Sequence, residues 1–378
     1  MTKHSTKPPA RKTQNSSSGR RRSTELRSIA PCAIGVDVGD RFSHVCILDG
    51  DGVPCKEERV RTSEAGFRQY FEALPRAQIA LEAGTHSGWV SRLLQACGHS
   101  AVVANARELR KIHQSDRKND RADAEILARM VRFDPQLLCP IRHRSAQMQA
   151  DLAVIRARDT LVAARTKCVN AARGLVKSVG ARLPKCSTHS FAAAVLDHVP
   201  VELHAALSPL IETISNLSEQ IRRYDRNIEA LAKNYPATDV LRQVSGVGAL
   251  TALTFVLTVA DPQRFRKSRD IGPYLGLVPR QDDSGDHVSQ LPITKAGDAH
   301  LRRLLVGSAQ YILGPFGPKC SLRSYGERLA QRGGRNAKKR AVVAVARKLA
   351  VLLHRLWITG EVYEALRSEP TQRSDRAA

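Results

Sequence analysis

The stretch IGVDVGD (34–40) places one aspartate, Asp37, inside an apolar run. Apolar residues on both sides of a short segment followed by glycine predict a buried β-strand. A carboxylate in the middle of such a strand is costly unless a partner compensates its charge. Asp37 is therefore the first candidate functional residue.

The sequence around this stretch predicts an α/β domain over residues 31–142. Three strands come first, and strands then alternate with helices, which indicates an α/β sheet with an initial meander. The strands are expected in CAIGVDVGD, SHVCILDGDG, EERVRTS, AQIALEAG and SAVVAN, and the helices in GFRQYFEAL and WVSRLLQACG.

Three further carboxylates occupy meaningful positions in the same region. Glu82 ends the strand AQIALEAG, and Asp120 and Asp123 lie three residues apart at the start of an apparent helix, which places them on one face. Each has an ordinary explanation as a surface or helix N-terminal residue. Metal-dependent phosphoryl transfer, however, needs several carboxylates within about 4 Å of one another. With Asp37, their order of strand, later strand and helix matches the acidic layout of RNase H-like nucleases and predicts a metal site.

The segment IGVDVGDRFSHV also resembles the first phosphate loop of actin-like ATPases and sugar kinases. Those enzymes need a second phosphate loop and a Gly-rich adenosine motif further along the chain. The sequence contains neither, so this reading is disfavoured.

The chain is strongly basic, with 60 Lys and Arg against 36 Asp and Glu, a formal net charge of +24 and a pI near 10.2. Such a charge attracts polyanions and predicts a nucleic-acid partner. The eight cysteines are scattered without a CxxC pair, which argues against a zinc finger or a disulfide scaffold. No signal peptide or membrane span is expected, so the predicted location is the cytoplasm, with no membrane partner.

The remaining chain predicts four more segments. Residues 1–30 are basic and rich in Ser, Thr and Pro, which predicts a disordered tail that either attracts phosphates or only solubilises the chain. Residues 143–236 show heptad spacing, which predicts a helical coiled-coil segment. That spacing fits either a homodimer or tetramer seam or two helices packed within one chain. Residues 237–366 predict a mainly helical domain, and 367–378 a polar tail.

The C-terminal region carries candidate phosphate contacts. In VSGVGALTALTFV (244–256), Gly246 and Gly248 suit a helix-hairpin-helix-like element, where glycines let backbone amides approach a phosphate. Other candidate nucleic-acid-binding residues lie in cationic turns and at helix starts; they are Arg264, Arg266, Lys267, Arg269, Lys295, Arg302, Arg303, Lys338, Lys339 and Arg340.

Taken in order, these motifs resemble a known family over about residues 31–366. The sequence is similar to the DEDD transposases of bacterial insertion sequences, which are relatives of the Piv/MooV invertases and include bridge-RNA-guided recombinases. The likeness rests on IGVDVGD, LEAGTHSGW, KNDRADAEILA, VSGVGALTA, YLGLVPRQDDSG and ITKAGDAHLRRLL.

The resemblance implies a RuvC-like (RNase H-fold) N-terminal domain, a coiled-coil segment and a C-terminal transposase domain. It implies that Asp37, Glu82, Asp120 and Asp123 hold Mg²⁺, in a two-metal site, and that Ser284 in the turn QDDSGD (281–286) is the nucleophile. Family members cut donor and target DNA through a covalent phosphoserine linkage, guided by a structured non-coding RNA, in the nucleoid of a bacterial cell.

The sequence departs from the family pattern at three places. Asn119 lies in KND (118–120), where KTD is more usual, and GDHVSQLP after Ser284 lacks the usual basic residues. The basic tail 1–30 is not a typical part of the pattern. Two other classes stay open: a RuvC-like metal-dependent nuclease that hydrolyses DNA with water, and a non-catalytic RNA-binding scaffold.

Overall fold

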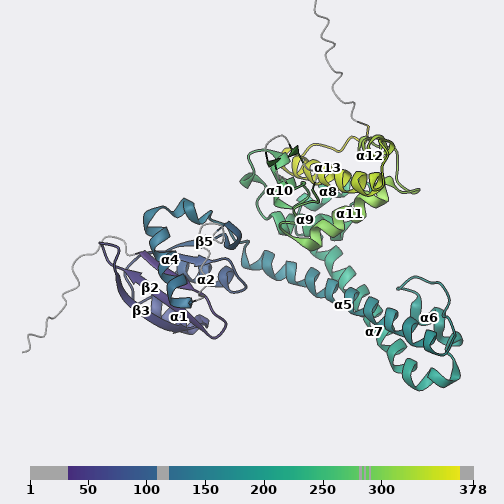
Figure 1. Ribbon diagram of the computed structural model, residues 1–378, viewed down its shortest axis with the longest axis horizontal. Helices are drawn as coiled ribbons and strands as arrows, with labels where there is room; N and C mark the ends of the chain where they lie inside the picture. Colours follow the sequence, from purple (N-terminus) through teal and green to yellow (C-terminus); the bar gives the residue numbers. More distant parts are fainter. Residues whose placement is uncertain (1–32, 109–118, 281–282, 285–286, 289–290, 367–378) are drawn as a thin grey trace, which may run out of the picture. The chain divides into compact units, whose positions relative to one another are not determined.

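The computed structural model describes residues 33–108, 119–280, 283–284, 287–288 and 291–366 (Figure 1). The backbone contacts divide the chain into two compact units, Met1–His143 and Arg144–Ala378, and each is described here by itself. Among the helices in the described ranges, none combines the length and apolar character needed to cross a membrane. The predicted tails, 1–30 and 367–378, lie outside these ranges.

The first unit is built on a five-stranded mixed sheet in the order β3-β2-β1-β4-β5. The pairs β1–β2 and β2–β3 are antiparallel, whereas β4 is parallel to both β1 and β5. The five predicted strands and the initial meander are confirmed. The strands are β1 (Ala33–Asp37), β2 (Phe42–Leu48), β3 (Pro54–Arg61), β4 (Gln78–Glu82) and β5 (Ser100–Ala104).

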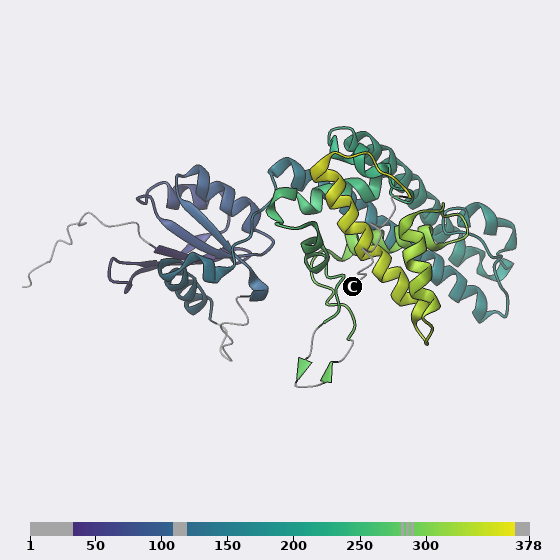
Figure 2. The same ribbon diagram turned by 90° about the horizontal axis from the view of Figure 1, so that it is seen from above.

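Helices cover both faces of this sheet (Figure 2). On one face, the larger side chains of the strands pack against α1 (Glu64–Phe71) and α2 (Ser87–Ala96). On the other face, small side chains such as Ala33, Ala80 and Ala104 pack against α4 (Asp120–Phe133), which the short 3-10 helix η1 (Pro135–Leu138) follows. Small residues let α4 approach the sheet closely.

Two arginines in the last turns of α4 donate hydrogen bonds to the turn between β2 and β3. Arg132 Nη2 donates to the carbonyl of Gly50 at 2.7 Å, and Arg129 Nη1 donates to the carbonyl of Gly52 at 3.4 Å. Asn119 caps the other end of the helix, where its side-chain oxygen accepts from the backbone N–H of Arg121 at 3.1 Å. The helix is therefore held at both ends, and the departure at Asn119 supplies a good N-cap.

Gly35 in the middle of β1 is required for the contact with α4. A Cβ at this position would lie 1.8 Å from the carbonyl oxygen of Ala124 and 2.5 Å from the amide nitrogen of Ala128. Gly35→Ala is expected to destabilise the protein by about 3 kcal/mol, because the clashing atoms are backbone and the helix must move. Urea unfolding measures the difference.

Gly84→Ala is the matched control, because no heavy atom lies within 4 Å of its would-be Cβ. Its stability should stay within about 0.5 kcal/mol of the wild type. Equal unfolding midpoints for the two variants would contradict the close packing of α4 on β1.

The second unit begins with two long antiparallel helices, α5 (Ala146–Ser178) and α7 (His204–Ala232). Arg158 Nε donates to Asp225 Oδ1 at 2.6 Å, and Arg165 Nη1 donates to Ser218 Oγ at 3.1 Å. The heptad-spaced residues face each other inside the chain, and many are buried. The structure thus uses this seam to pack two helices of one chain. The connection contains α6 (Phe191–Val195), η2 (Leu196–His198) and η3 (Val201–Leu203).

The rest of the second unit surrounds an apolar helix, α9 (Ala249–Val259), of which ten residues are buried. The base of the α5–α7 pair packs on α9 through Leu152, Ile228 and Leu253. The predicted segments 143–236 and 237–366 therefore share one unit, apart from His143, which belongs to the first. The other helices are α8 (Ala237–Arg242), η4 (Pro262–Arg264), η5 (Ser268–Asp270), α10 (Ile271–Tyr274), α11 (Ala299–Leu313), α12 (Ser321–Gln331) and α13 (Ala337–Thr359).

Candidate functional site

The four predicted carboxylates belong to adjoining elements of the first unit. Asp37 ends β1 and Glu82 ends β4, and because these strands are parallel neighbours, both residues lie at the same edge of the sheet. Asp120 and Asp123 lie in the first turn of α4, the helix packed on β1 and β4. The four carboxylates, which are far apart in the sequence, therefore belong to elements that meet at one edge of the sheet.

The electrostatics of Asp37 link all four carboxylates. Burial, followed by the negative charges of Asp120, Asp123 and Glu82 in that order, raises the pKa of Asp37 to about 6, while His44 opposes the shift. The charges of the other three carboxylates thus act on the buried Asp37. A cation at this edge would relieve that repulsion.

The donor chemistry of this edge fits a hard divalent cation. Carboxylate oxygens are the ligands that Mg²⁺ and Ca²⁺ prefer. Within the described ranges, however, no group of three or more His, Cys, Asp or Glu side chains is arranged so that it could hold a metal ion. The residues fit Mg²⁺ in kind, and their side chains would need to draw together around the ion.

Two histidines lie beside this edge, and sequence reasoning did not find either. His44 on β2 is the cross-strand partner of Asp37, and its Nε2 lies 3.8 Å from Asp120 Oδ2. His86 Nε2 lies 3.6 Å from Asp40 Oδ1, while its Nδ1 accepts from Trp89 Nε1 at 3.0 Å. The register of β1 and β2 brings His44 to the site, and the sequence alone does not fix that register.

The raised pKa of Asp37 predicts a pH-dependent stability. Its folded pKa of about 6 lies above the ordinary value, so the stability that the neutral form contributes is present below pH ~4 and is lost as pH rises through 6. At pH 7.5 in a chelator, Asp37→Asn should therefore be more stable than the wild type, by up to about 3 kcal/mol.

The gain of Asp37→Asn should disappear near pH 4, and urea unfolding at the two pH values measures it. Asp51→Asn serves as the control, since this residue is exposed in the turn after β2. A variant no more stable than the wild type at pH 7.5 would show that burial and the neighbouring carboxylates do not destabilise the charged form of Asp37.

Ser284 lies in the second unit, on a β-hairpin between α10 and α11. Strand β6 (Asp283–Ser284) pairs antiparallel with β7 (His287–Val288), so that Ser284 is the backbone partner of His287. Below these strands, Arg280 N donates to the carbonyl of Pro292 at 3.0 Å. The rest of the predicted turn QDDSGD, namely 281–282 and 285–286, lies outside the described residues.

We call residues 276–280 and 291–297, which lead to and from the hairpin strands, the stem of this hairpin. Two glycines, Gly276 and Gly297, and Arg302 hold its two sides together. Gly276 has φ +66°, and a Cβ there would lie 2.2 Å from the amide nitrogen of Ala296. The Arg302 guanidinium donates to the carbonyls of Leu275, Ala296 and Gly297. Arg302, predicted from its charge to bind nucleic acid, thus fixes the stem of the hairpin that carries Ser284.

Gly246 and Gly248 line a cavity of about 580 Å³ between the start of α9 and α11. Gly246 has φ +85°, and a Cβ there would lie 2.9 Å from Tyr311 Cδ1. Arg303 lines the same cavity, while its Nη2 lies 2.6 Å from both carboxylate oxygens of Asp159 on α5. The start of α9 adjoins this cavity, while the cation beside it is paired with Asp159, so phosphate contact here stays a prediction.

The other predicted cations are distributed over the surface of the second unit. Arg264 stacks over Tyr274, 4.9 Å from the ring centroid, and is exposed. Lys295 adopts φ +54°, and Arg340 Nη2 donates to the carbonyl of Gly333 at 3.4 Å. The exposed members of the set are Arg264, Arg266, Lys267, Arg269, Lys295, Arg303, Lys338, Lys339 and Arg340.

Together, these features define a protein with a carboxylate-bearing α/β unit and a basic helical unit that presents a serine on a hairpin. The chain belongs to the IS116/IS110/IS902 family of transposases, whose model matches residues 238–321. A second model, for DEDD transposases of the IS110 type, matches residues 34–180. The first of these ranges contains Ser284, and the second contains all four carboxylates.

Relatives match along most of the chain. A probable family 20 transposase of Pseudomonas aeruginosa is 29% identical over 85% of this chain and 95% of its own length. The transposase for insertion sequence element IS1111A of Coxiella burnetii is 28% identical, covering 87% and 90%. A putative transposase of Sinorhizobium fredii, y4pF/y4sB, is 30% identical, covering 81% and 79%.

Proposed function

We propose that this chain cuts and rejoins DNA at an insertion sequence through a covalent link to Ser284, assisted by the carboxylates Asp37, Glu82, Asp120 and Asp123. The observation that carries the proposal is the placement of Asp37 and Glu82 at one sheet edge beside the first turn of α4, where burial and the neighbouring carboxylates raise the pKa of Asp37. The family membership supports it, because its relatives include a transposase for an insertion sequence element.

In the proposed cleavage step, Ser284 Oγ attacks the phosphorus of a DNA phosphodiester. The Oγ–P bond forms, the bond from phosphorus to one deoxyribose oxygen breaks, and the serine proton passes to a base while the released oxygen is protonated. The resulting phosphoserine conserves the energy of the phosphodiester. A free deoxyribose hydroxyl then attacks it, joins the new ends and returns the serine.

Mg²⁺, in one or two ions, would supply charge neutralisation at the phosphate and activation of the hydroxyl nucleophile. Asp37, Glu82, Asp120 and Asp123 would hold it. The proposed step needs the carboxylates and Ser284 to act on the same phosphodiester, although they belong to different units. We propose that a homodimer or tetramer supplies them, either from one chain or from two.

We further propose that a structured non-coding RNA guides the reaction by pairing with donor and target DNA. The net charge of +24 supports a polyanionic partner such as RNA. The RNA that co-purifies with the protein, expressed together with the DNA flanking its gene, would be sequenced. Recovery of bulk cellular RNA alone would contradict a dedicated guide.

The decisive experiment is to trap the protein on a supercoiled donor plasmid with Mg²⁺ and the flanking non-coding RNA, and then denature it. The proposal expects DNA covalently attached to the protein. A metal-dependent nuclease would cut the plasmid without such an adduct, and a non-catalytic RNA-binding scaffold would leave it intact. Either of these outcomes would refute the proposed function.

A further inference from the structure

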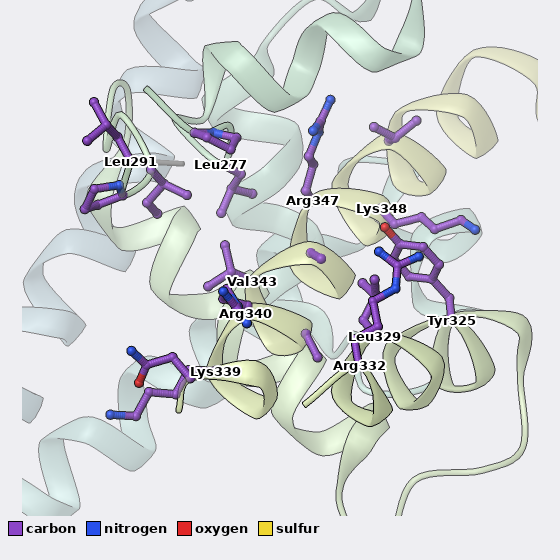
Figure 3. Close-up of a pocket in the computed structure, with 17 residues that line it drawn as sticks. Leu277, Leu291, Tyr325, Leu329, Arg332, Lys339, Arg340, Val343, Arg347 and Lys348 are labelled. Carbon is purple, nitrogen blue, oxygen red and sulfur yellow. The ribbon is translucent and has the colours of Figure 1, made fainter. Parts of the chain in front are cut away.

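A groove of about 920 Å³ lies between α12, α13 and the stem of the hairpin that carries Ser284 (Figure 3). Leu277 and Leu291 come from the two sides of the stem, Leu329 from α12 and Val343 from α13. Pro279 and Ile293, which form an isolated bridge across the stem, also line it. One wall of the groove is thus continuous with the arms leading to Ser284.

The charge of this groove has a single sign. Five cationic side chains and no Asp or Glu occur among its lining residues; the cations are Arg332, Lys339, Arg340, Arg347 and Lys348. Helices usually mix charges of both signs on a solvated face, so a groove lined by one sign needs a reason. An anionic ligand supplies one.

Three of these cationic side chains make no hydrogen bond or ion pair with the described residues. In the part of the chain that the structure describes, no hydrogen bond or ion pair engages the side chains of Arg332, Lys339 or Arg347. All three are exposed. Their charges are therefore available to a ligand, without a partner that must first be released.

The groove also offers an aromatic surface and an apolar one. Tyr325 on α12 lines it, with Lys348 Nζ 4.3 Å from its ring centroid (Figure 3). Single-stranded nucleic acid is bound by this combination, since bases stack on aromatic and apolar side chains while cations follow the phosphates. A duplex keeps its base faces stacked inside and offers this groove only its phosphates.

We propose that this groove binds a single-stranded segment of nucleic acid and passes it along the hairpin stem toward Ser284. The proposal rests on the proposed function only in taking nucleic acid as the partner. It assigns Arg332, Lys339, Arg347 and Tyr325 to strand binding, of which only Lys339 was indicated by the sequence.

The test compares two double variants that remove equal charge. Lys339→Gln/Arg347→Gln removes two groove cations, and Lys233→Gln/Lys319→Gln removes two exposed lysines that do not line the groove. Fluorescence anisotropy measures their binding, in EDTA to prevent cleavage, to labelled oligonucleotides of about 12 nucleotides: single-stranded DNA, single-stranded RNA and duplex DNA. Thermal melting confirms that both variants fold.

The groove variant should bind single strands at least about tenfold more weakly than the control variant, and its salt slope should fall by about 1.4, for two lost phosphate contacts. Duplex binding should be the same in both variants. Whichever single strand binds more tightly, DNA or RNA, identifies the strand that uses the groove. Equal single-strand affinities for the two variants would overturn the proposal, and so would an equal loss for duplex.

Tyr325→Leu separates stacking from simple attraction of phosphates. It keeps apolar area but removes the ring, and it should weaken single-strand binding at least about fivefold while leaving the salt slope unchanged. An unchanged affinity would exclude base stacking in the groove. Because these assays measure binding alone, their failure is distinguishable from the absence of a covalent adduct.

Discussion

Asp37→Asn is expected to lower DNA cleavage and rejoining by at least about 10³-fold. Asp37 ends β1 at the acidic edge, and its loss would remove one of the four proposed Mg²⁺ ligands. The proposed ion would supply several kcal/mol of transition-state stabilisation, at about 1.4 kcal/mol per factor of ten. The rate of donor cleavage on a supercoiled plasmid, at saturating Mg²⁺, measures the effect.

Two properties of this variant make the result interpretable. Its stability in a chelator at pH 7.5 should rise, because asparagine removes a repelled charge, so inactivity cannot be assigned to unfolding. Its RNA binding should stay near that of the wild type. The change therefore separates chemistry from folding.

Asp40→Asn provides the matched control. Asp40 lies three residues further on and is highly exposed, with its carboxylate 3.6 Å from His86 Nε2, and it is not one of the four carboxylates. Its cleavage rate should remain within about fivefold of the wild type, as for an exposed ion pair. If Asp37→Asn also kept its rate within tenfold, the acidic edge would not be the site of catalysis.

Ser284→Ala is expected to eliminate the covalent protein–DNA adduct altogether. Alanine has no oxygen to form a bond with phosphorus, and removal of a serine nucleophile lowers rates by up to about 10⁶-fold in a well-studied hydrolase. The adduct is measured after denaturation as labelled DNA that migrates with the protein. Binding to the oligonucleotides should be unchanged.

Ser289→Ala is the control for this change, since Ser289 lies five residues further along the same sequence. Its adduct should form at the wild-type rate. If the adduct survived in Ser284→Ala and disappeared in Ser289→Ala, the nucleophile would be Ser289. Persistence in both variants would move the covalent link to another residue.

Local patterns were sufficient to predict the sheet and the order of its acidic residues. Apolar runs ending at Gly39, Gly50 and Gly84 mark strands, and the three-residue spacing of Asp120 and Asp123 marks the start of a helix. These signals act within a few residues of each other. These signals can therefore be interpreted from the sequence without knowledge of the fold.

Features that depend on contacts between distant segments could not be predicted from the sequence in this way. The heptad spacing of residues 143–236 is equally compatible with pairing within or between chains, and only the structure shows α5 against α7. Arg302 and Lys339 carry the same charge in the sequence. The structure shows that Arg302 donates to three backbone carbonyls, one of them 27 residues away, whereas Lys339 is exposed and lines the groove.

The groove shows why some candidate residues were missed. Arg347 was missed, although it lies seven residues after the predicted Arg340 and on the same face of α13. Its significance appears only when Tyr325 of α12 and Arg332, the C-cap of that helix, join it. Helical spacing predicts a shared face on one helix. It does not predict which neighbour completes the surface.

The attachment of α4 has a consequence for inheritance and engineering. Asp120 lies at one end of this helix and Arg132 at the other, about 18 Å away at 1.5 Å per residue. The backbone contact at Gly35 and the arginine contacts at Gly50 and Gly52 set the height and rotation of the helix. Mutations that never touch DNA can therefore adjust the placement of two catalytic candidates, and sequence drift at the far end of α4 should be matched by compensating changes in the turn between β2 and β3.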